Sequence, residues 1–532
     1  MGKGRRNAGA STSDSDRHQR RRLDDPAPVL EYAGWTPPAR GAPHSVHRAP
    51  AAEMSPEKFY DTYVSKRRPV VLTGGLENTP WARCTETWTD GFLKNHPEGD
   101  SLVRVETRTD TNQSFGKGKY QQMRFCDFME RFSSGDDKLY LTASPASTDA
   151  HGRPSVASAP ASFLVGETHP AQIPFRPKLA GNLVPANVNL WMGVSGNKSK
   201  SGLHHDHHDN LYVLLQGTKT FELYQPDTVT QMYTIGTPRK VHRNGLINYI
   251  EGGTSFEDGD AGGLKKRILS QKVRDAEAEV QAVLDTVHGD LDPVDTEWLR
   301  TAEEKLDDAM DATMGDFTRE LRSDGDDDDD DSESGDENDF AGHDDFDDLS
   351  DSDLEFEEEE EDGFYQSEFE VRSEEQEMIR QSLQRNKERK EKLERDPPSF
   401  SQTSRAAPSD VPKNFPLFVK AQETRMMTTT VRAGEILFLP TGWFHEVSSS
   451  GDTSAEDGDR KNQKEGGNKD DKNKKHAALN YWFHPPLFGA SFATPYGTQE
   501  RQDMWESDWT AWVEMREDER KSREEPKKTK KK

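Results

Sequence analysis

Two histidines and one aspartate in this sequence have the residue types and the spacing of a metal site. His204 and Asp206 are separated by one residue, and His445 lies far downstream, directly after the run 436–444 (Ile-Leu-Phe-Leu-Pro-Thr-Gly-Trp-Phe). On a β-strand, residues i and i+2 point to the same side, so His204 and Asp206 can reach one ion together. Two imidazoles and one carboxylate bind Fe(II) on one face and leave positions open for other ligands. The pattern therefore predicts an iron site that a distant strand completes with His445.

The His-x-Asp triplet alone is weak evidence, because the chain contains 16 histidines. Four such triplets occur, and they begin at His204, His207, His288 and His343. The triplet at His288 lies in a polar stretch of helical composition and that at His343 in an acidic tract, and neither has a strand pattern or a matching later histidine. Only the first is predicted to bind metal. The other histidines beside it are expected to have structural or solvent-facing roles: His205, His207 and His208.

Three separate segments, in the same order along the chain, resemble the jumonji-C and cupin-like oxygenases. Residues 201–226 (Ser-Gly-Leu-His-His-Asp, continuing to Gln-Pro) resemble the first metal-binding segment of that family, and residues 431–447 resemble the second. Residues 480–483 (Asn-Tyr-Trp-Phe) resemble the strand that closes the site. The similarity covers roughly residues 28–252 and 413–485, and within the family the motifs are most similar to those of a lysyl hydroxylase.

The resemblance also implies a 2-oxoglutarate site. This co-substrate chelates iron through its 2-oxo acid end, and its second carboxylate needs a cation on a neighbouring strand. In the family the lysine at the position of Lys219 has this role, although the residues alone also fit a lysine on a surface hairpin. Ser201 and Tyr140 match residues that share the same carboxylate, and Asn210 and Asn480 match polar residues near the iron and the co-substrate.

Composition limits how much of the chain can fold. Hydrophobic residues make up only 31%, against about 45–50% in ordinary globular chains. Residues 324–362 contain 24 Asp and Glu and no Lys or Arg, out of a net charge of -28 for the whole chain. Such a tract cannot bury enough apolar surface to offset the entropy of ordering it. The acidity is therefore expected to belong to a disordered segment, and this segment is the predicted interaction feature.

Alternating short β-branched and aromatic runs predict a mainly β catalytic domain that a long acidic insertion interrupts. The resemblance implies that this domain is a double-stranded β-helix of the cupin or jumonji-C type, with flanking helices and an insertion that is partly helical and partly disordered. The expected divisions are a disordered basic arm at 1–27, the N-terminal part of the catalytic domain at 28–252, the insertion at 253–412, the C-terminal part at 413–500 with a disordered loop at 451–475, and a charged tail at 501–532.

The remaining composition excludes several classes of protein. The two cysteines form no CxxC pair, which argues against a disulfide framework or a zinc module and favours a reducing compartment. No run of 18 apolar residues is present, so no membrane partner is expected. We expect a soluble protein of the cytoplasm, the nucleus or both. A homodimer is one arrangement that the sequence permits.

The predicted reaction is Fe(II)- and 2-oxoglutarate-dependent oxidation, by O2, of a C–H bond in a protein side chain. The family resemblance implies hydroxylation of lysine, and demethylation of N-methyl-lysine or N-methyl-arginine, as on a histone, is the first alternative. A second alternative is a non-catalytic cupin scaffold that binds basic proteins, and the intact ligand set argues against it. The acidic tract is a candidate docking segment for a basic protein substrate. An RNA substrate would need a basic groove, and the folded part of the chain is not clearly basic, so nucleic acid is not expected as the main partner.

Overall fold

The computed structural model divides into two compact units, residues 1–262 with 393–532 and residues 263–392. The predicted basic arm (except residue 27), the acidic tract 324–362, and the loop 451–475 (except its last two residues) lie outside the described residues. In the second unit the described residues are helical, among them 298–310. The structure describes residues 27–38, 43–108, 119–143, 155–166, 169, 171–195, 199–250, 268, 272–273, 275–276, 278–283, 298–310, 397–450 and 474–524.

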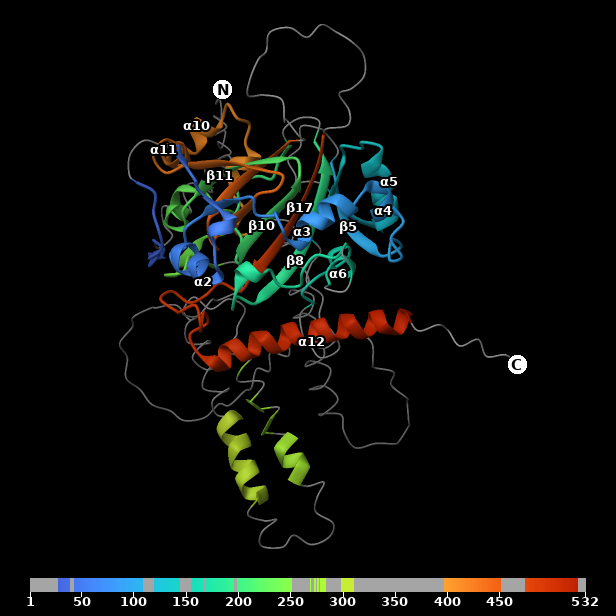
Figure 1. Ribbon diagram of the computed structural model, residues 1–532. Helices are drawn as coiled ribbons and strands as arrows, with labels where there is room; N and C mark the ends of the chain where they lie inside the picture. The colour runs from blue at the N-terminus through green and yellow to red at the C-terminus, as the bar shows by residue number, and fades with distance from the viewer. Residues whose placement is uncertain are drawn as a thin grey trace, which may run out of the picture. The chain divides into compact units, whose positions relative to one another are not determined.

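The first unit is built on two sheets that face each other, with a small third sheet beside them (Figure 1). Most strand pairs are antiparallel, and strands far apart in the sequence are neighbours. The nine-stranded sheet has the order β3 (His47–Pro50), β4 (Val70–Thr73), β15 (Ile436–Leu439), β10 (Asp209–Gln216), β17 (Lys475–Phe483), β8 (Pro185–Val194), β7 (Leu139–Leu141), β5 (Leu102–Thr107), β6 (Lys119–Arg124). The five-stranded sheet has the order β2 (His44–Ser45), β14 (Met427–Arg432), β11 (Thr218–Tyr224), β16 (Phe444–Ser450), β9 (Ser199–Lys200). The third sheet has the order β1 (Val29–Leu30), β12 (Pro238–Val241), β13 (Ile247–Tyr249).

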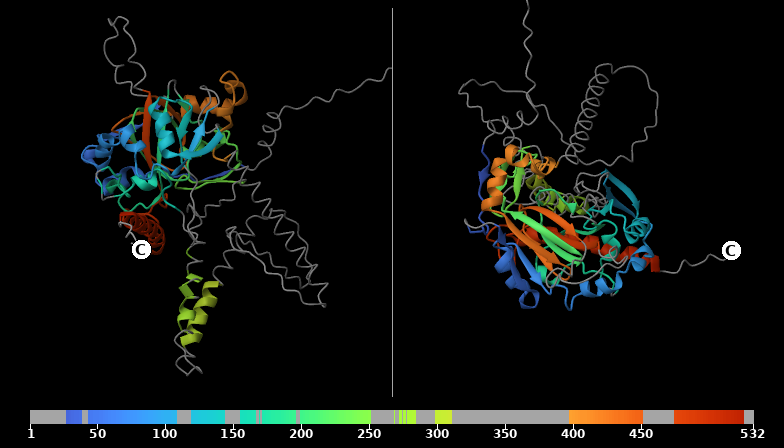
Figure 2. Two further views of the ribbon diagram at one scale, coloured as in Figure 1. Left: turned by 90° about the vertical axis from the view of Figure 1, so that its right-hand side faces the viewer. Right: turned by 90° about the horizontal axis from the view of Figure 1, so that it is seen from above.

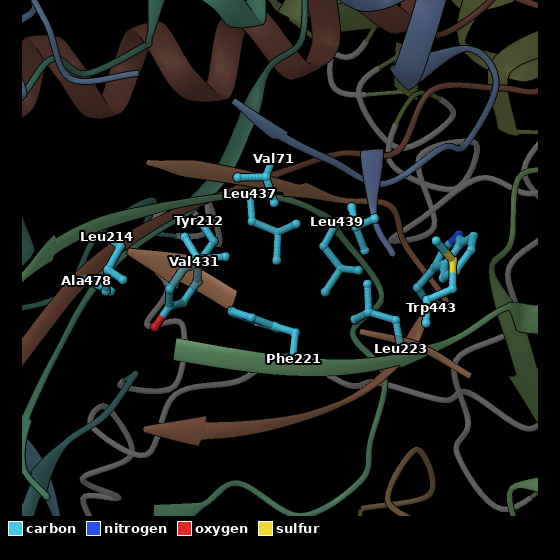
Figure 3. Packing of buried hydrophobic residues seen from close by; sticks show 12 residues of the cluster. Val71, Tyr212, Leu214, Phe221, Leu223, Val431, Leu437, Leu439, Trp443 and Ala478 are labelled. Atoms are coloured by element: carbon cyan, nitrogen blue, oxygen red, sulfur yellow. The ribbon is translucent and has the colours of Figure 1, made fainter. Parts of the chain in front are cut away.

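Apolar side chains fill one part of the space between the two large sheets (Figure 3). Strand β11 alternates half-buried and buried residues, as a strand with one covered face should. Its Phe221 and Leu223 belong to one hydrophobic cluster with Leu437 and Leu439 of β15. Trp443 is a buried member of the same cluster. This arrangement of two facing, mainly antiparallel sheets confirms the predicted double-stranded β-helix.

The strands β10 and β11 follow each other through a turn that requires glycine. Gly217 has a φ of +84°, and a Cβ at this position would lie 2.8 Å from the Cβ of His476. Glycine adopts this left-handed conformation without the steric cost that other residues have. The turn passes the chain from the nine-stranded sheet to the five-stranded sheet, and so places β11 opposite β10.

Helices cover the outside of the first unit, as predicted (Figures 1 and 2). In α5 the phenylalanines 125, 128 and 132 recur at helical spacing and are buried. The helices and helical turns are η1 (Ala51–Glu53), α2 (Pro56–Phe59), η2 (Tyr60–Val64), α3 (Pro80–Thr87), α4 (Asp90–Lys94), α5 (Phe125–Ser133), α6 (Ala161–Leu164), η3 (Lys178–Ala180), η4 (Pro226–Gln231), η6 (Gln402–Arg405), α10 (Val411–Asn414), α11 (Pro416–Thr424) and α12 (Gln499–Glu524).

The region predicted as a charged tail from residue 501 differs from that expectation, because most of it forms α12. Trp505, Trp509 and Trp512 are buried although the helix is highly charged. Trp505 stacks on His484 with ring centroids 3.5 Å apart. The ring of Trp509 meets that of Phe175 edge to face at 6.1 Å. A narrow stripe of three tryptophans therefore holds this helix against the rest of the first unit, and average composition does not reveal such a stripe.

The predicted end of the insertion, at residue 412, also differs from the structure. Residues 397–405, which we call the anchor segment, belong to the first unit. Ser401 is buried, and its N–H donates to the carbonyl of Leu203 at 2.8 Å. Ser404 Oγ accepts from the N–H of Leu203 at 2.7 Å. The Pro- and Ser-rich composition suggested a linker, but here the serines satisfy backbone groups beside the first predicted metal ligand.

Candidate metal centre

The fold brings the three predicted metal ligands together. Among the described residues, His204, Asp206 and His445 form the group whose ligand atoms all lie within 4.8 Å of one another. His445 Nε2 and Asp206 Oδ2 are 3.8 Å apart, and the two imidazole centroids are 4.3 Å apart. Two backbone hydrogen bonds between His204 and His445, of 2.7 and 3.1 Å, form a β-bridge that fixes this approach.

Both imidazoles present Nε2 as the free nitrogen. His204 Nδ1 lies 2.9 Å from the carbonyl oxygen of Gly202, and His445 Nδ1 lies 3.0 Å from that of Trp443. A carbonyl only accepts, so each Nδ1 carries the proton and each Nε2 keeps its lone pair. Burial lowers the pKa of His445 to about 4, which keeps this imidazole neutral, as a ligand must be. Two nitrogens and one carboxylate oxygen on one face fit Fe(II) with open positions.

The turn before His445 holds the loop that carries Asp206. Gly442 N donates to the backbone carbonyl of Asp206 at 2.9 Å, and Thr441 Oγ1 donates to the same carbonyl at 3.2 Å. Gly442 has a φ of +73°, and a Cβ there would lie 1.8 Å from the carbonyl oxygen of Gly245. Only glycine fits this position, which explains the Pro-Thr-Gly-Trp pattern before the third ligand.

A buried ion pair supports the same loop from behind. Asp209, three residues after Asp206, accepts hydrogen bonds from both terminal nitrogens of the Arg67 guanidinium. Its carboxylate also accepts from the N–H of Thr441 at 2.9 Å. Arg67 Nε donates to the carbonyl of Asn244 at 2.9 Å. The segments that carry Asp206 and His445 are therefore joined through one carboxylate.

The aromatic ring of Phe400, from the anchor segment, covers His204. The two rings are nearly parallel, at an interplanar angle of 10° and a centroid distance of 4.7 Å. Phe400 also forms an isolated β-bridge with His204, and its carbonyl accepts from the N–H of Ile235 at 2.7 Å. Sequence reasoning missed Phe400, because this residue follows the low-complexity insertion and no motif marks it.

Lys219 lies on the inner face of β11 as a buried cation, only 1% exposed. Its Nζ donates to Ser449 Oγ at 2.6 Å and lies 5.6 Å from the ring centre of Tyr140. Among the described residues no carboxylate lies within ion-pair distance of it. Burial lowers its pKa to about 7. A buried cation without a counter-ion fits the distal carboxylate of a dicarboxylate such as 2-oxoglutarate.

The other predicted co-substrate residues have different surroundings. Asn480 Oδ1 accepts from Trp191 Nε1 at 2.9 Å. Asn210 is buried, and its Oδ1 has no partner in the structure. Ser201 Oγ donates to the carbonyl of Gly202 at 2.9 Å and accepts from the N–H of Val447 at 3.0 Å, and its expected role at the co-substrate stays a prediction. Its hydroxyl thus serves the backbone between β9 and β16, and the contact that the structure gives Lys219 comes from Ser449.

Strand alternation could have identified Ser449. It lies four residues after His445 on β16, so both side chains point to the same face. The register of β11 and β16 places it directly opposite Lys219. The sequence analysis named Ser201 instead, because the family resemblance implied a contact with the co-substrate carboxylate at that position.

The neighbouring histidines are packed within the protein. His205 Nε2 lies 2.7 Å from the hydroxyl of Tyr249. His208 stacks on Trp482 at a centroid distance of 5.7 Å. The ring of His207 meets that of His205 at 5.0 Å. These contacts agree with the predicted structural role.

Comparison with known proteins identifies the family. The sequence model of one protein family, the cupin-like domain, matches residues 56–487 of this chain. The chain belongs to the cupin-like domain family. Its ligand set and its fold agree with the jumonji-C members of that family, which are commonly Fe(II)- and 2-oxoglutarate-dependent oxygenases.

Three relatives carry the jumonji-C designation or a related name. JmjC domain-containing protein 4 of Schizosaccharomyces pombe is 27% identical over 474 residues, which are 84% of this chain and 85% of the relative. JmjC domain-containing protein E of Dictyostelium discoideum is 28% identical over 32% of this chain and 49% of its own length. Lysine-specific demethylase JMJ32 of Arabidopsis thaliana is 24% identical over 34% of this chain and 52% of its own length. The comparisons support the family, and they do not support the particular similarity to a lysyl hydroxylase.

In the part of the chain that the structure describes, no helix has the length and apolar character to cross a membrane.

Proposed function

We propose that this protein is an Fe(II)- and 2-oxoglutarate-dependent oxygenase that hydroxylates a protein side chain, with lysine as the preferred residue. One observation supports the proposal above all others. A converged His204, Asp206 and His445 group shares the interior of the two sheets with the buried Lys219, which lacks a counter-ion among the described residues. A scaffold has no need for both features.

Each group has a definite task in this proposal. His204, Asp206 and His445 hold the iron through Nε2, a carboxylate oxygen and Nε2. Iron with 2-oxoglutarate and O2 supplies the oxidant that breaks a C–H bond. Lys219 neutralises the distal carboxylate of 2-oxoglutarate, and Ser449 and Tyr140 orient the ammonium group. The Nδ1–H groups of the two histidines keep the imidazole planes fixed through their bonds to carbonyl oxygens.

Demethylation of N-methyl-lysine is the second candidate. The relative from Arabidopsis thaliana is named a lysine-specific demethylase, which favours this candidate, although that relative aligns with only 34% of this chain. The same oxidation leads to either outcome, because the result depends on which carbon lies at the iron. A basic protein is the proposed substrate in both cases. The acidic tract 324–362 is its proposed docking segment, and the cytoplasm and the nucleus are the proposed compartments.

A turnover experiment tests the proposal. Purified protein with Fe(II), 2-oxoglutarate and O2 is expected to convert 2-oxoglutarate to succinate, and faster when a protein extract is added. Mass spectrometry of the extract then distinguishes the candidates, because hydroxylation adds one oxygen atom and demethylation removes a methyl group. Asp206→Ala is the control and should abolish both signals. Oxidised products that persist in the Asp206→Ala reaction would contradict the proposal.

A further inference from the structure

A cavity of about 650 Å³ lies on the outer face of the nine-stranded sheet, and we call it the outer cavity. Its lining includes Ile436, the first residue of β15. The next residue, Leu437, belongs to the cluster between the two large sheets, so Ile436 points to the opposite face. Trp81 of α3 also lines the cavity, and its Nε1 donates to the hydroxyl of Tyr481 at 3.2 Å. The outer cavity is therefore separate from the interior that contains the metal ligands.

Three segments that lie far apart in the sequence form the walls of the outer cavity. They come from residues 51–56 around η1, from residues 74–83 between β4 and α3, and from the described part of residues 166–179 before β8. Four of the lining residues are prolines, at positions 56, 80, 174 and 177. Proline restricts the backbone, so these walls lose little conformational freedom when a ligand binds. The volume lies within the range of about 300–1,000 Å³ that is typical of binding pockets.

Positively charged side chains outnumber carboxylates around the outer cavity. Arg83 of α3, Arg176 and Lys178 of η3 line it, and Glu77 is the one carboxylate among its described lining residues. The guanidinium of Arg83 and the ammonium group of Lys178 make no hydrogen bond or ion pair with any described residue. Arg176 Nη2 donates to Glu506 of α12 at 2.6 Å, but its buried Nε has no partner among the described residues. Since the whole chain has a net charge of -28, this local excess of positive charge indicates a negatively charged ligand.

The apolar part of the lining narrows the class of ligand. Met54, Leu179 and Ile436 offer a surface for an apolar side chain. Trp81 is only 4% exposed, so its indole does not offer the open aromatic face on which a nucleic-acid base stacks. A peptide can supply both groups that the cavity suits, because an apolar side chain can stand between carboxylates that form charge-assisted hydrogen bonds with arginine and lysine.

We propose that the outer cavity is a docking site for an acidic peptide segment of a partner protein. The segment carries an apolar side chain between aspartates or glutamates. The apolar side chain contacts the floor of the cavity, and the carboxylates pair with Arg83 and Lys178. This interaction goes beyond the proposed oxygenase function, because it takes place on the opposite face of the sheet and needs neither iron nor 2-oxoglutarate.

Isothermal titration of full-length protein with short peptides tests the docking site. The probe is the acetylated and amidated peptide Ser-Asp-Asp-Leu-Asp-Asp-Ser. In one comparison peptide asparagine replaces each aspartate, and in the other serine replaces leucine. We expect the acidic peptide to bind about tenfold more tightly than the asparagine peptide at low salt, the combined effect of two or three exposed ion pairs. The difference should shrink as salt is added, because salt screens these pairs. The serine peptide should also bind more weakly than the leucine peptide.

The double variant Arg83→Gln with Lys178→Gln removes two cations at exposed positions, so it is expected to fold. It should bind the acidic peptide about tenfold more weakly than wild type does, and no better than it binds the asparagine peptide. The matched control is Lys66→Gln with Lys413→Gln, which makes the same change of charge at exposed positions outside the cavity. Its affinity should equal that of wild type. Ala52→Trp places a large side chain at an exposed lining position and should weaken binding without a change of charge.

Equal affinities of the acidic and asparagine peptides for wild-type protein would overturn the docking site. An unchanged affinity in the Arg83 and Lys178 double variant, or an equal loss in the control variant, would overturn it as well. Tighter binding of a single-stranded oligonucleotide of the same charge would assign the cavity to nucleic acid, and a dimer that Ala52→Trp abolishes would assign it to a second copy of the chain; either result would overturn the peptide assignment. The double variant should still convert 2-oxoglutarate to succinate, so failure of the docking site is distinguishable from failure of the proposed oxygenase function.

Discussion

Loss of the ion pair between Arg67 and Asp209 is expected to destabilise the protein strongly. The two side chains are 1% and 0% exposed. Asp209 accepts two hydrogen bonds from Arg67 and one from the N–H of Thr441. In Arg67→Met, Asp209 becomes a buried anion that keeps only the Thr441 N–H among its described partners.

The magnitude follows from that arrangement. Removal of one partner of a buried ion pair costs about 3–5 kcal/mol, which is a large part of the about 5–15 kcal/mol that stabilises a typical protein. The double variant Arg67→Met with Asp209→Leu removes both charges, and it leaves the Thr441 N–H and the Asn244 carbonyl without these partners. We expect it to be more stable than Arg67→Met by about 1–3 kcal/mol.

Urea unfolding of the two single variants and the double variant, followed by circular dichroism, measures this coupling. Arg131→Met is the control, because Arg131 pairs with Asp136 on the surface with 46% of its side chain exposed, and its unfolding midpoint should not change. The reasoning is refuted if the two single losses add up in the double variant, or if Arg67→Met costs no more than a surface pair.

Three further predictions concern the site itself. Above pH 7 the affinity for 2-oxoglutarate should fall by up to about tenfold per pH unit, because Lys219, whose pKa is about 7, must take up a proton to bind the dicarboxylate. Buried His476 does not add to this slope, because burial holds its pKa well below the ordinary value. Isothermal titration in Lys219→Arg should show a flat profile, since arginine stays charged, and a persisting slope would contradict the assignment. Phe400→Ala should weaken Co(II) binding by about 2- to 12-fold, the value of one aromatic stack, and Phe400→Tyr should restore it; equal affinities in wild type and Phe400→Ala would rule out the stack as a support of His204. Gly442→Ala should abolish Co(II) binding while circular dichroism shows retained strands, because its Cβ would clash with the Gly245 carbonyl; retained Co(II) affinity would show that the turn can relax.

Much of this molecule could be predicted from its sequence, because strand periodicity and local motifs identify residues within single strands. The His204 and Asp206 spacing depends only on strand alternation, whereas the role expected of Lys219 came from the family resemblance, because its sequence context alone also fits a lysine on a surface hairpin. Phe400 and Trp505 could not be predicted in the same way. Phe400 is an isolated aromatic residue in a polar stretch, and Trp505 is one of three tryptophans in a highly charged stretch. Each contact joins the two large sheets to a segment outside the recognisable motifs.

Pairing register set a second limit on prediction. The asparagines 187 and 189 lie more than 200 positions from Trp482 and Asn480, and nothing in the local sequence of β8 indicates which strand it pairs with. Only the register places them opposite β17. The sequence pattern therefore predicted the residues of the metal group, and it did not indicate which residues of β8 lie beside β17.

Absorption spectroscopy under anaerobic conditions tests the central claim most directly. Fe(II) and 2-oxoglutarate are added together to the purified full-length protein, with Asp206→Ala as the matched variant. The account predicts a visible charge-transfer band from iron chelated by the 2-oxo acid in the wild-type protein and none in the variant. A well-folded wild-type protein without the band, or an equal band in Asp206→Ala, would contradict it.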